Sequence, residues 1–152
     1  MKKLAILGAI VALIAVMAYI AVRPFSGIIP DGDPNTIQMK IGRAEFEVLI
    51  ADEPEEQAVG LSNRDSINEN TGMFFVFAQE VTPAFWMKGM RFDLDFIWIN
   101  GDTVIDITEN VSHRDQEQLY RPLGPVTGVL EVLAGEARRK GVGIGDRVVV
   151  GD

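Results

Sequence analysis

The chain begins with a long apolar run that no charged side chain interrupts. Residues 4–22 read LAILGAIVALIAVMAYIAV. A helix of this length extends about 28 Å at a rise of about 1.5 Å per residue, which is close to the thickness of the hydrocarbon core of a bilayer. The pattern predicts one transmembrane helix, and residues 1–23 are interpreted as an N-terminal membrane anchor.

The charges beside this run predict its orientation. Lys2 and Lys3 precede it together with the amino terminus, and only Arg23 follows closely. The positive-inside rule then places the N-terminus in the cytoplasm and the C-terminal domain outside, as in a single-pass protein of the cell membrane. A cleaved signal peptide is the alternative, because Val16-Met17-Ala18 can act as a weak cleavage site.

A segment rich in proline and glycine follows the anchor. Residues 24–35, PFSGIIPDGDPN, hold three of the seven prolines and show no amphipathic period. Such a composition is typical of an extended linker. Residues 36–152 are therefore expected to form one extracytoplasmic domain.

Short alternating or apolar segments dominate residues 36–152 and predict β-strands. TIQMKI and AEFEVLIA flank Gly42-Arg43, which suits a type II′ hairpin. DFIWI and TVIDI flank Asn100-Gly101-Asp102, where Asn-Gly favours a tight primed turn. Further strands are expected at MFFVFA (73–78), AFWMK (84–88), GVLEVL (128–133) and RVVV (147–150).

Two short helices are expected between these strands. Asp52 and Glu55 have the spacing of a capping box for a helix that runs to about Ser62. GEARRK has cations near its C-terminal end and is followed by Gly141, which favours a helix stop. The fold class expected is mainly β: an antiparallel β-sandwich or small barrel with two short helices.

Composition narrows the chemistry that this domain can perform. The chain has no cysteine and one histidine, which excludes disulfides, thiol nucleophiles and multi-histidine metal sites, so no metal is expected. The glycines of GVGIGD precede a strand instead of a helix, so no nucleotide cofactor is expected. After position 23, 11 basic residues face 22 acidic ones, and the formal charge of −11 disfavours nucleic acid as a partner.

Residues 83–101 contain the densest mixture of aromatic and charged side chains. In an extended strand, Phe85 and Met87 face one side while Trp86 and Lys88 face the other. Trp86 and Lys88 suit a cation–π contact or a stacking surface for a sugar or an aromatic ligand. Core packing is the simpler interpretation of Trp86.

Two aspartates follow on a single strand face. Asp93 and Asp95 are two positions apart, which places their bases about 6.6 Å from each other. Inverting glycosidases hold their carboxyl groups about 6.5 to 9.5 Å apart, so this geometry permits acid/base chemistry. Arg91, on the same face, favours the alternative that the pair belongs to a structural ion network.

Two more charged residues extend the candidate set. Arg64 follows the first predicted helix and either reaches a carboxylate such as Asp95 or Glu131, or is an ordinary surface arginine. Glu131 is a lone acid in VLEVL, and the alternation of the strand favours its exposure over burial beside a partner. The candidate binding residues are Arg64, Trp86, Lys88, Asp93 and Asp95, and no residue is assigned as catalytic.

Several ordered motifs resemble those of a known family, called domain of unknown function 192. They are GLSNR (60–64), GMFFVF (72–77), FWMKGM (85–90), LDFIWI (94–99), VLEVLAGEA (129–137) and GIGD (143–146). The resemblance covers about residues 37–150 and implies a mainly β fold and frequent export, but no reaction. The family pattern usually reads Gly-Leu-Met-x-Arg and Phe-Trp-Met-Lys-Asn-Thr, whereas this chain has Ser62 for the methionine and Gly89-Met90 for Asn-Thr.

These features favour a non-catalytic binding or cell-envelope-associated role, because no nucleophile–base pair or metal cluster is evident in the sequence. One alternative is an envelope glycan hydrolase that uses Asp93 or Asp95. Another is a structural or chaperone-like partner of a second membrane protein. The expected partners are the membrane, through residues 4–22, and an envelope glycan or a membrane protein.

Overall fold

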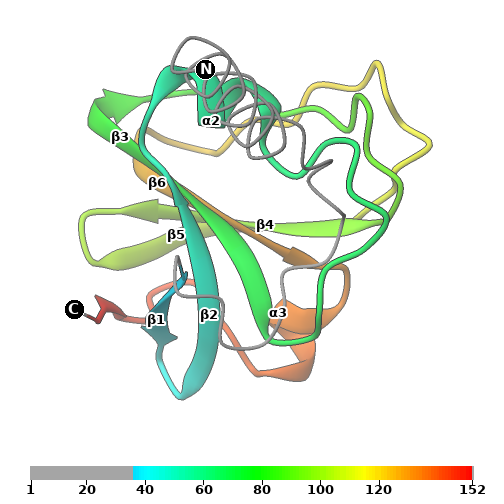
Figure 1. The fold of residues 1–152 in the computed structure, drawn as a ribbon. Helices are drawn as coiled ribbons and strands as arrows, with labels where there is room; N and C mark the ends of the chain where they lie inside the picture. The colour runs from blue at the N-terminus through cyan, green and yellow to red at the C-terminus, as the bar shows by residue number, and fades with distance from the viewer. Residues whose placement is uncertain (1–35, 152) are drawn as a thin grey trace, which may run out of the picture.

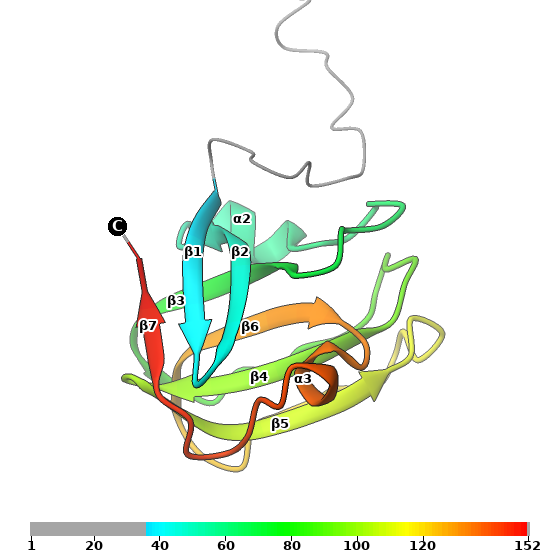
Figure 2. The ribbon, with the colours of Figure 1, turned by 90° about the horizontal axis from the view of Figure 1, so that it is seen from below.

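The structure, a computed structural model, describes residues 36–151. These residues form one seven-stranded sheet curled into a half barrel, with two short helices (Figures 1 and 2). The mainly β prediction is confirmed, and the single sheet resembles the predicted barrel more than a sandwich of two sheets. The predicted anchor and linker lie outside the described residues. Within residues 36–151, no helix is long and apolar enough to cross a membrane.

The strands follow the order β5-β4-β6-β3-β2-β1-β7 across the sheet. Their bounds are β1 (Thr36–Ile41), β2 (Ala44–Ala51), β3 (Thr71–Val81), β4 (Leu94–Asn100), β5 (Thr103–Val111), β6 (Val126–Leu133) and β7 (Val148–Val150). The helices are α2 (Pro54–Val59) and α3 (Glu136–Arg139). The central strands β4, β6 and β3 are therefore flanked by neighbours on both sides.

Both predicted hairpins are present, with glycine as the first turn residue in each. Gly42 adopts a φ of +57° between β1 and β2, and Gly101 adopts +58° between β4 and β5. Asn100 pairs with Thr103 as a strand residue, so the second turn consists of Gly101 and Asp102. The sequence predicts Asn100-Gly101 as the centre of this turn, and the structure places the centre one residue later.

The sheet is mixed, which corrects the prediction of a wholly antiparallel fold. β2 and β3 run parallel over five residue pairs, from Glu47–Thr71 to Ala51–Phe75. Two parallel neighbours need a crossover connection, and here α2 and the loop that follows it provide one. This crossover carries the loop to one face of the sheet, where it becomes part of the candidate site.

The first helix also begins differently from the prediction. Glu53 and Glu56 form the capping box, in place of Asp52 and Glu55, and the helix ends at Val59. Pro54 explains the shift, because proline is favoured at the first helical position and the residue before it is held in an extended conformation. Glu53 has that conformation, with φ −96° and ψ 146°.

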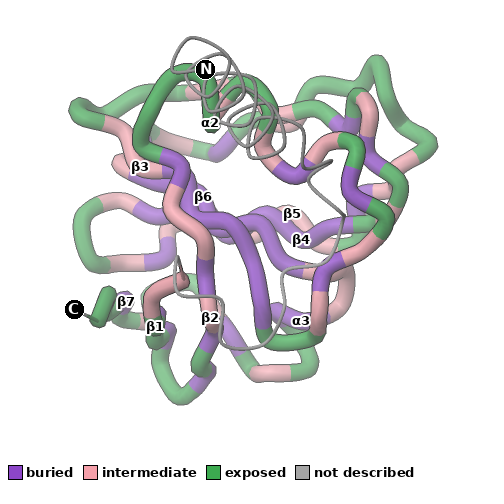
Figure 3. Tube along the Cα trace, in the orientation of Figure 1, coloured by how far each residue is buried: buried purple, intermediate pink, exposed green. Residues whose placement is uncertain are grey.

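The central strands are buried on both faces (Figure 3). In β4, Phe96 and Trp98 belong to one cluster of buried side chains, which we call the Trp98 core. Ile97 and Ile99 belong to a second cluster on the other face, which we call the Ile97 core. This arrangement explains the continuous apolar runs of the central strands, and it confirms the predicted alternation along β4.

Loops cover the Trp98 core, and one of them was predicted as a strand. In the segment 84–88, only Phe85 pairs, through a single bridge to Tyr120. The Phe85 amide donates to the Tyr120 carbonyl at 2.9 Å, and the Tyr120 amide donates to the Phe85 carbonyl at 2.8 Å. The alternation in AFWMK therefore describes side chains of an irregular loop that lies over the sheet.

Candidate functional site

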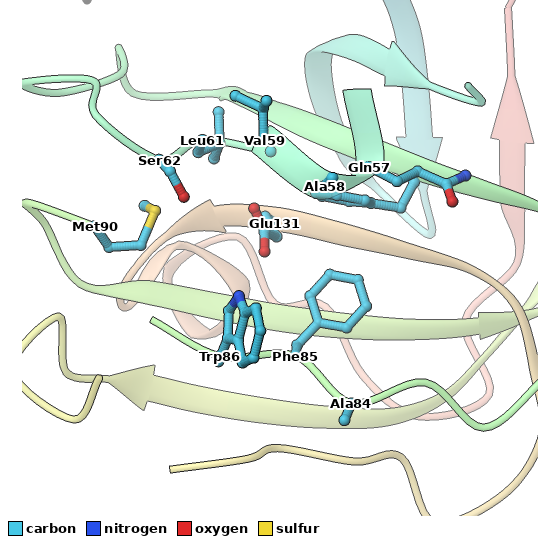
Figure 4. A pocket seen from close by; sticks show the side chains of 12 residues that line it. Gln57, Ala58, Val59, Leu61, Ser62, Ala84, Phe85, Trp86, Met90 and Glu131 are labelled. Carbon is cyan, nitrogen blue, oxygen red and sulfur yellow. The ribbon is translucent and has the colours of Figure 1, made fainter. Parts of the chain in front are cut away.

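A pocket of about 90 Å³ opens between two loops that cover the Trp98 core (Figure 4). One wall consists of residues 57–62, from α2 and the turn after it. The other wall consists of residues 84–86 and Met90. Glu131 of β6 forms its floor, and Phe75 of β3 also lines it. Residues from four separate parts of the chain thus meet in this pocket.

The first wall is held to the sheet by the side chain of Gln57 and by a tight helix end. Gln57 Nε2 donates to the carbonyl oxygens of Ala51 at 3.2 Å and Val76 at 2.8 Å. Gly60 ends the helix with a φ of +51°, and a Cβ there would lie 3.1 Å from Phe75 Cζ. Glycine is therefore favoured here by its backbone conformation, and a Cβ at this position would also need the Phe75 ring to shift slightly.

The second wall is anchored by the ring of Phe85. Its centroid lies 5.0 Å from that of Phe75, 5.6 Å from Phe96 and 5.5 Å from Trp98, in edge-on or tilted contacts. Aromatic pairs at such distances stabilise a fold beyond their buried area. The anchored Phe85 fixes the position of Trp86, which stands at the rim of the pocket.

Trp86 is 55% exposed, so the interpretation that it packs in the core is wrong. Phe85 and Met87 do point into the Trp98 core, while Trp86 and Lys88 point outward, as the alternation predicts. Lys88 Nζ lies 5.7 Å from the centroid of the Trp86 ring, which is the predicted cation–π contact. A large aromatic surface is thus held in place while remaining open to solvent.

Glu131 is the buried acid at the floor of the pocket. It is 6% exposed, between Met73 of β3 and Phe96 of β4 in the sheet register. Within residues 36–151, its carboxyl group makes no hydrogen bond or ion pair. Burial raises the pKa of Glu131 to about 8, so the carboxyl group is mostly neutral at pH 7.

The prediction that Glu131 is exposed is wrong because β6 lies in the middle of the sheet. Its neighbours Leu130 and Val132 pack in the Ile97 core, and Val129 packs in the Trp98 core. The run VLEVL is apolar at both odd and even positions apart from the acid, which is the pattern of a strand buried on both faces. That signal identifies Glu131 as a buried acid, and such an acid near a cleft is a candidate functional group.

Asp95 has a structural environment on the opposite face of the sheet. It is fully buried, with an exposed fraction of 0%. Oδ1 accepts a hydrogen bond from the Asn110 amide at 2.7 Å, and Oδ2 accepts one from the Ala137 amide at 3.1 Å. The carboxylate therefore ties the end of β5 to the start of α3.

Asp93 is partly exposed and holds a neighbouring loop. Its Oδ1 accepts from the His113 amide at 2.7 Å and lies 2.6 Å from His113 Nδ1. These hydrogen bonds hold the pKa of Asp93 below its usual range. Arg91 pairs with Asp65, which differs from its predicted place beside Asp93 and Asp95.

The structure thus brings together only part of the predicted set. Trp86 lines the pocket and Lys88 contacts Trp86, whereas Arg64, Asp93 and Asp95 do not line it. Arg64 is buried, with an exposed fraction of 5%. Among residues 36–151, no three His, Cys, Asp or Glu side chains gather in a way that suits a metal ion.

Comparison with known proteins identifies the family. Residues 36–150 match the sequence model of domain of unknown function 192 (DUF192), which is described as uncharacterized ACR. The chain belongs to the DUF192 family. No curated protein matches it.

Two solved structures resemble this DUF192 chain over most of its length. One, from Sinorhizobium meliloti 1021, is described as "a putative transcription regulator"; it is 29% identical, with a TM-score of 0.71, and the match covers 76% of this chain and 93% of that one. The other, a protein of unknown function from Novosphingobium aromaticivorans DSM 12444, is 29% identical with a TM-score of 0.73, covering 84% of this chain and 90% of that one.

Two of the three departures from the usual DUF192 pattern, Ser62 and Met90, line the pocket, and the third, Gly89, precedes Met90 in the loop. Gly89, in place of asparagine, has a φ of +76°, in the left-handed region that glycine and asparagine both tolerate. Met90, in place of threonine, is buried in the Trp98 core and lines the pocket. Ser62, in place of methionine, donates from Oγ to the Lys88 carbonyl at 3.0 Å and so joins the two walls.

Proposed function

We propose that this DUF192 chain is a non-catalytic binding protein, anchored in the cell membrane, whose extracytoplasmic domain binds an envelope glycan. The observation that carries the proposal is the pocket of Glu131 and Trp86. Glu131 is 94% buried as a residue, its carboxyl group has no hydrogen-bond partner within residues 36–151, and it lies beside the half-exposed ring of Trp86. Among residues 36–151, Oε2 of Glu136 is the only fully buried side-chain oxygen or nitrogen without a hydrogen bond, so the unpartnered Glu131 oxygens are accessible from the pocket, where a ligand can bond to them.

A glycan suits this surface because sugars combine apolar and polar faces. The C–H face of a pyranose ring packs on an aromatic ring, and its polar substituents form hydrogen bonds. Trp86 offers the ring at the rim, and Glu131 offers the polar group at the floor. The other side chains of the pocket are mostly apolar, as is usual for small-molecule sites in which few polar groups fix the orientation.

The contacts of the two aspartates support binding over hydrolysis. Both oxygens of Asp95 already accept hydrogen bonds from backbone amides, and Asp93 is bonded to His113. Glu131 is the only acid that lines the described pocket. A glycosidase of the usual kind needs a pair of carboxyl groups about the scissile bond, and this pocket presents one.

Removing the exposed ring is expected to weaken glycan binding about fivefold or more, because stacking on an aromatic ring contributes about 1 kcal/mol or more. The test is co-sedimentation of the full-length protein, in a detergent without a sugar head group, with protein-free insoluble cell-wall glycan. Trp86→Ala is compared with wild type and with Glu117→Gln, which changes an exposed carboxylate elsewhere. Equal sedimentation of the Trp86→Ala and wild-type proteins would reject the proposal.

The membrane topology needs a separate test. Protease added to intact cells or spheroplasts should digest the region after residue 36 and leave an N-terminal tag protected. The reason is the charge asymmetry around residues 4–22, which favours a cytoplasmic N-terminus. A C-terminal domain that becomes accessible only after lysis would contradict the extracytoplasmic placement.

A further inference from the structure

The pocket contains two polar groups that the fold leaves unused. Within residues 36–151, neither the Glu131 carboxyl group nor the indole N–H of Trp86 has a hydrogen-bond partner. Figure 4 shows the nitrogen-bearing edge of the Trp86 ring turned toward Glu131. A ligand group between them therefore meets an N–H donor on one side and a carboxyl group on the other.

The charge state of the pocket selects a neutral group. Burial keeps the Glu131 carboxyl protonated at neutral pH, and in that form it both donates and accepts a hydrogen bond. Of the residues that line the pocket, Glu131 is the only acid and none is basic. Lys88, whose Nζ lies 5.7 Å from the Trp86 centroid, would repel a cationic ligand at the rim.

The size and walls of the pocket limit the group further. A volume of about 90 Å³ is well below the usual range of about 300 to 1,000 Å³ for sites that enclose a whole small molecule. The pocket thus accepts a substituent and leaves the rest of the ligand at the rim, against Trp86. Leu61, Phe75, Phe85 and Met90 provide apolar contacts inside, which favour a substituent that carries a methyl group.

We infer that the pocket binds the acetamido group of an N-acetylated amino sugar. The acetamido carbonyl accepts a hydrogen bond from the Trp86 indole, its N–H donates to the Glu131 carboxyl group, and its methyl group packs against the apolar walls. The pyranose ring then rests at the rim against Trp86. This assignment rests on the proposed function above and specifies which chemical group of the glycan is recognised.

The other candidate substituents fit less well. A hydroxyl group offers no methyl group to the apolar walls, and a free amino group is protonated and brings a charge to a site that lacks an ionised partner. A carboxylate would give up its hydration in a pocket in which none of the lining residues is basic. The acetamido group alone among these is neutral, carries both a donor and an acceptor, and has an apolar end.

Three matched sugars test the assignment. Binding of N-acetylglucosamine, glucosamine and glucose to the full-length protein is measured by calorimetry at pH 7, in a detergent without a sugar head group. N-acetylglucosamine is expected to bind at least tenfold more tightly than the other two. Glucosamine lacks the acetyl group and carries a charge, whereas glucose lacks the whole acetamido group and is neutral, so the two comparisons together separate the effect of the acetamido group from that of charge.

Two substitutions at Glu131 test the role of the carboxyl group. Glu131→Gln keeps a neutral donor and acceptor and is expected to bind N-acetylglucosamine within about threefold of wild type. Glu131→Leu removes both and is expected to weaken binding at least tenfold. Melting temperatures of the variants show that each is folded, and Glu117→Gln serves as the unchanged control.

The outcomes separate this inference from the proposed function. If all three sugars bind equally, or Glu131→Leu binds like wild type, the acetamido assignment is overturned. If none of the sugars binds while cell-wall glycan still sediments the protein in a Trp86-dependent way, the assignment is again overturned and the glycan-binding proposal stands. If Trp86→Ala also leaves sedimentation unchanged, both are overturned.

Discussion

Wild-type protein is expected to lose much of its stability as the pH rises, because Glu131 then ionises. The Glu131→Gln variant is expected to lack this loss. The pKa of Glu131 is raised to about 8 in the folded state, from the ordinary value of 4.5. The folded state therefore holds the proton more tightly than the unfolded state. Its stabilising effect is fully present below pH 4.5 and is lost as the pH rises to about 8.

The size of this effect follows from the width of the pH window. Each unit of pKa difference corresponds to about 1.36 kcal/mol, so the free energy of unfolding of wild type should fall by up to about 5 kcal/mol relative to Glu131→Gln. Denaturant unfolding at pH 5, 7 and 9, followed by the fluorescence of the buried Trp98, measures it. Glu117→Gln should follow wild type at every pH, and a Glu131→Gln protein that does the same would contradict the burial of an unpaired carboxyl group.

Replacing Asp95 with alanine is expected to destabilise the domain by about 2 to 5 kcal/mol. The substitution leaves the Asn110 and Ala137 amides without their acceptor, and each buried unsatisfied group costs about 1 to 3 kcal/mol. The same measurement on Asp93→Ala should show a smaller loss, because Asp93 is partly exposed. Equal losses in the two variants would show that Asp95 does not tie β5 to α3.

The local parts of the fold could be predicted from the sequence. A glycine-first turn between two alternating strands depends on residues that are close in the chain, and the hairpins at Gly42 and Gly101 are both present. The parallel pairing of β2 with β3 depends on where a crossover loop places a later strand. No local pattern specifies that placement, so the mixed sheet could not be predicted in the same way.

The candidate site could be predicted only in part, for a related reason. The alternation of AFWMK correctly separated Phe85 from Trp86, but whether that outer face is covered depends on other loops, and Trp86 proved exposed. The burial of Glu131 depends on β6 lying between β3 and β4. Asp95 was a candidate for acid/base chemistry because no nearby residue in the sequence reveals a partner for its carboxylate. Its partners are the amides of Asn110 and Ala137, which come much later in the chain.

The pairing of the two ends of the described chain bears on when the domain is able to fold. β7, the last strand, pairs with β1, the first (Figure 2). Residues just before β7 also bond to the start of β5, where the Val104 amide donates to the Asp146 carbonyl at 3.0 Å. Long-range pairings of this kind form late, because they close the longest loops. If the domain crosses a membrane in the order of its sequence, it completes this sheet only after β7 has emerged, so that maturation follows translocation.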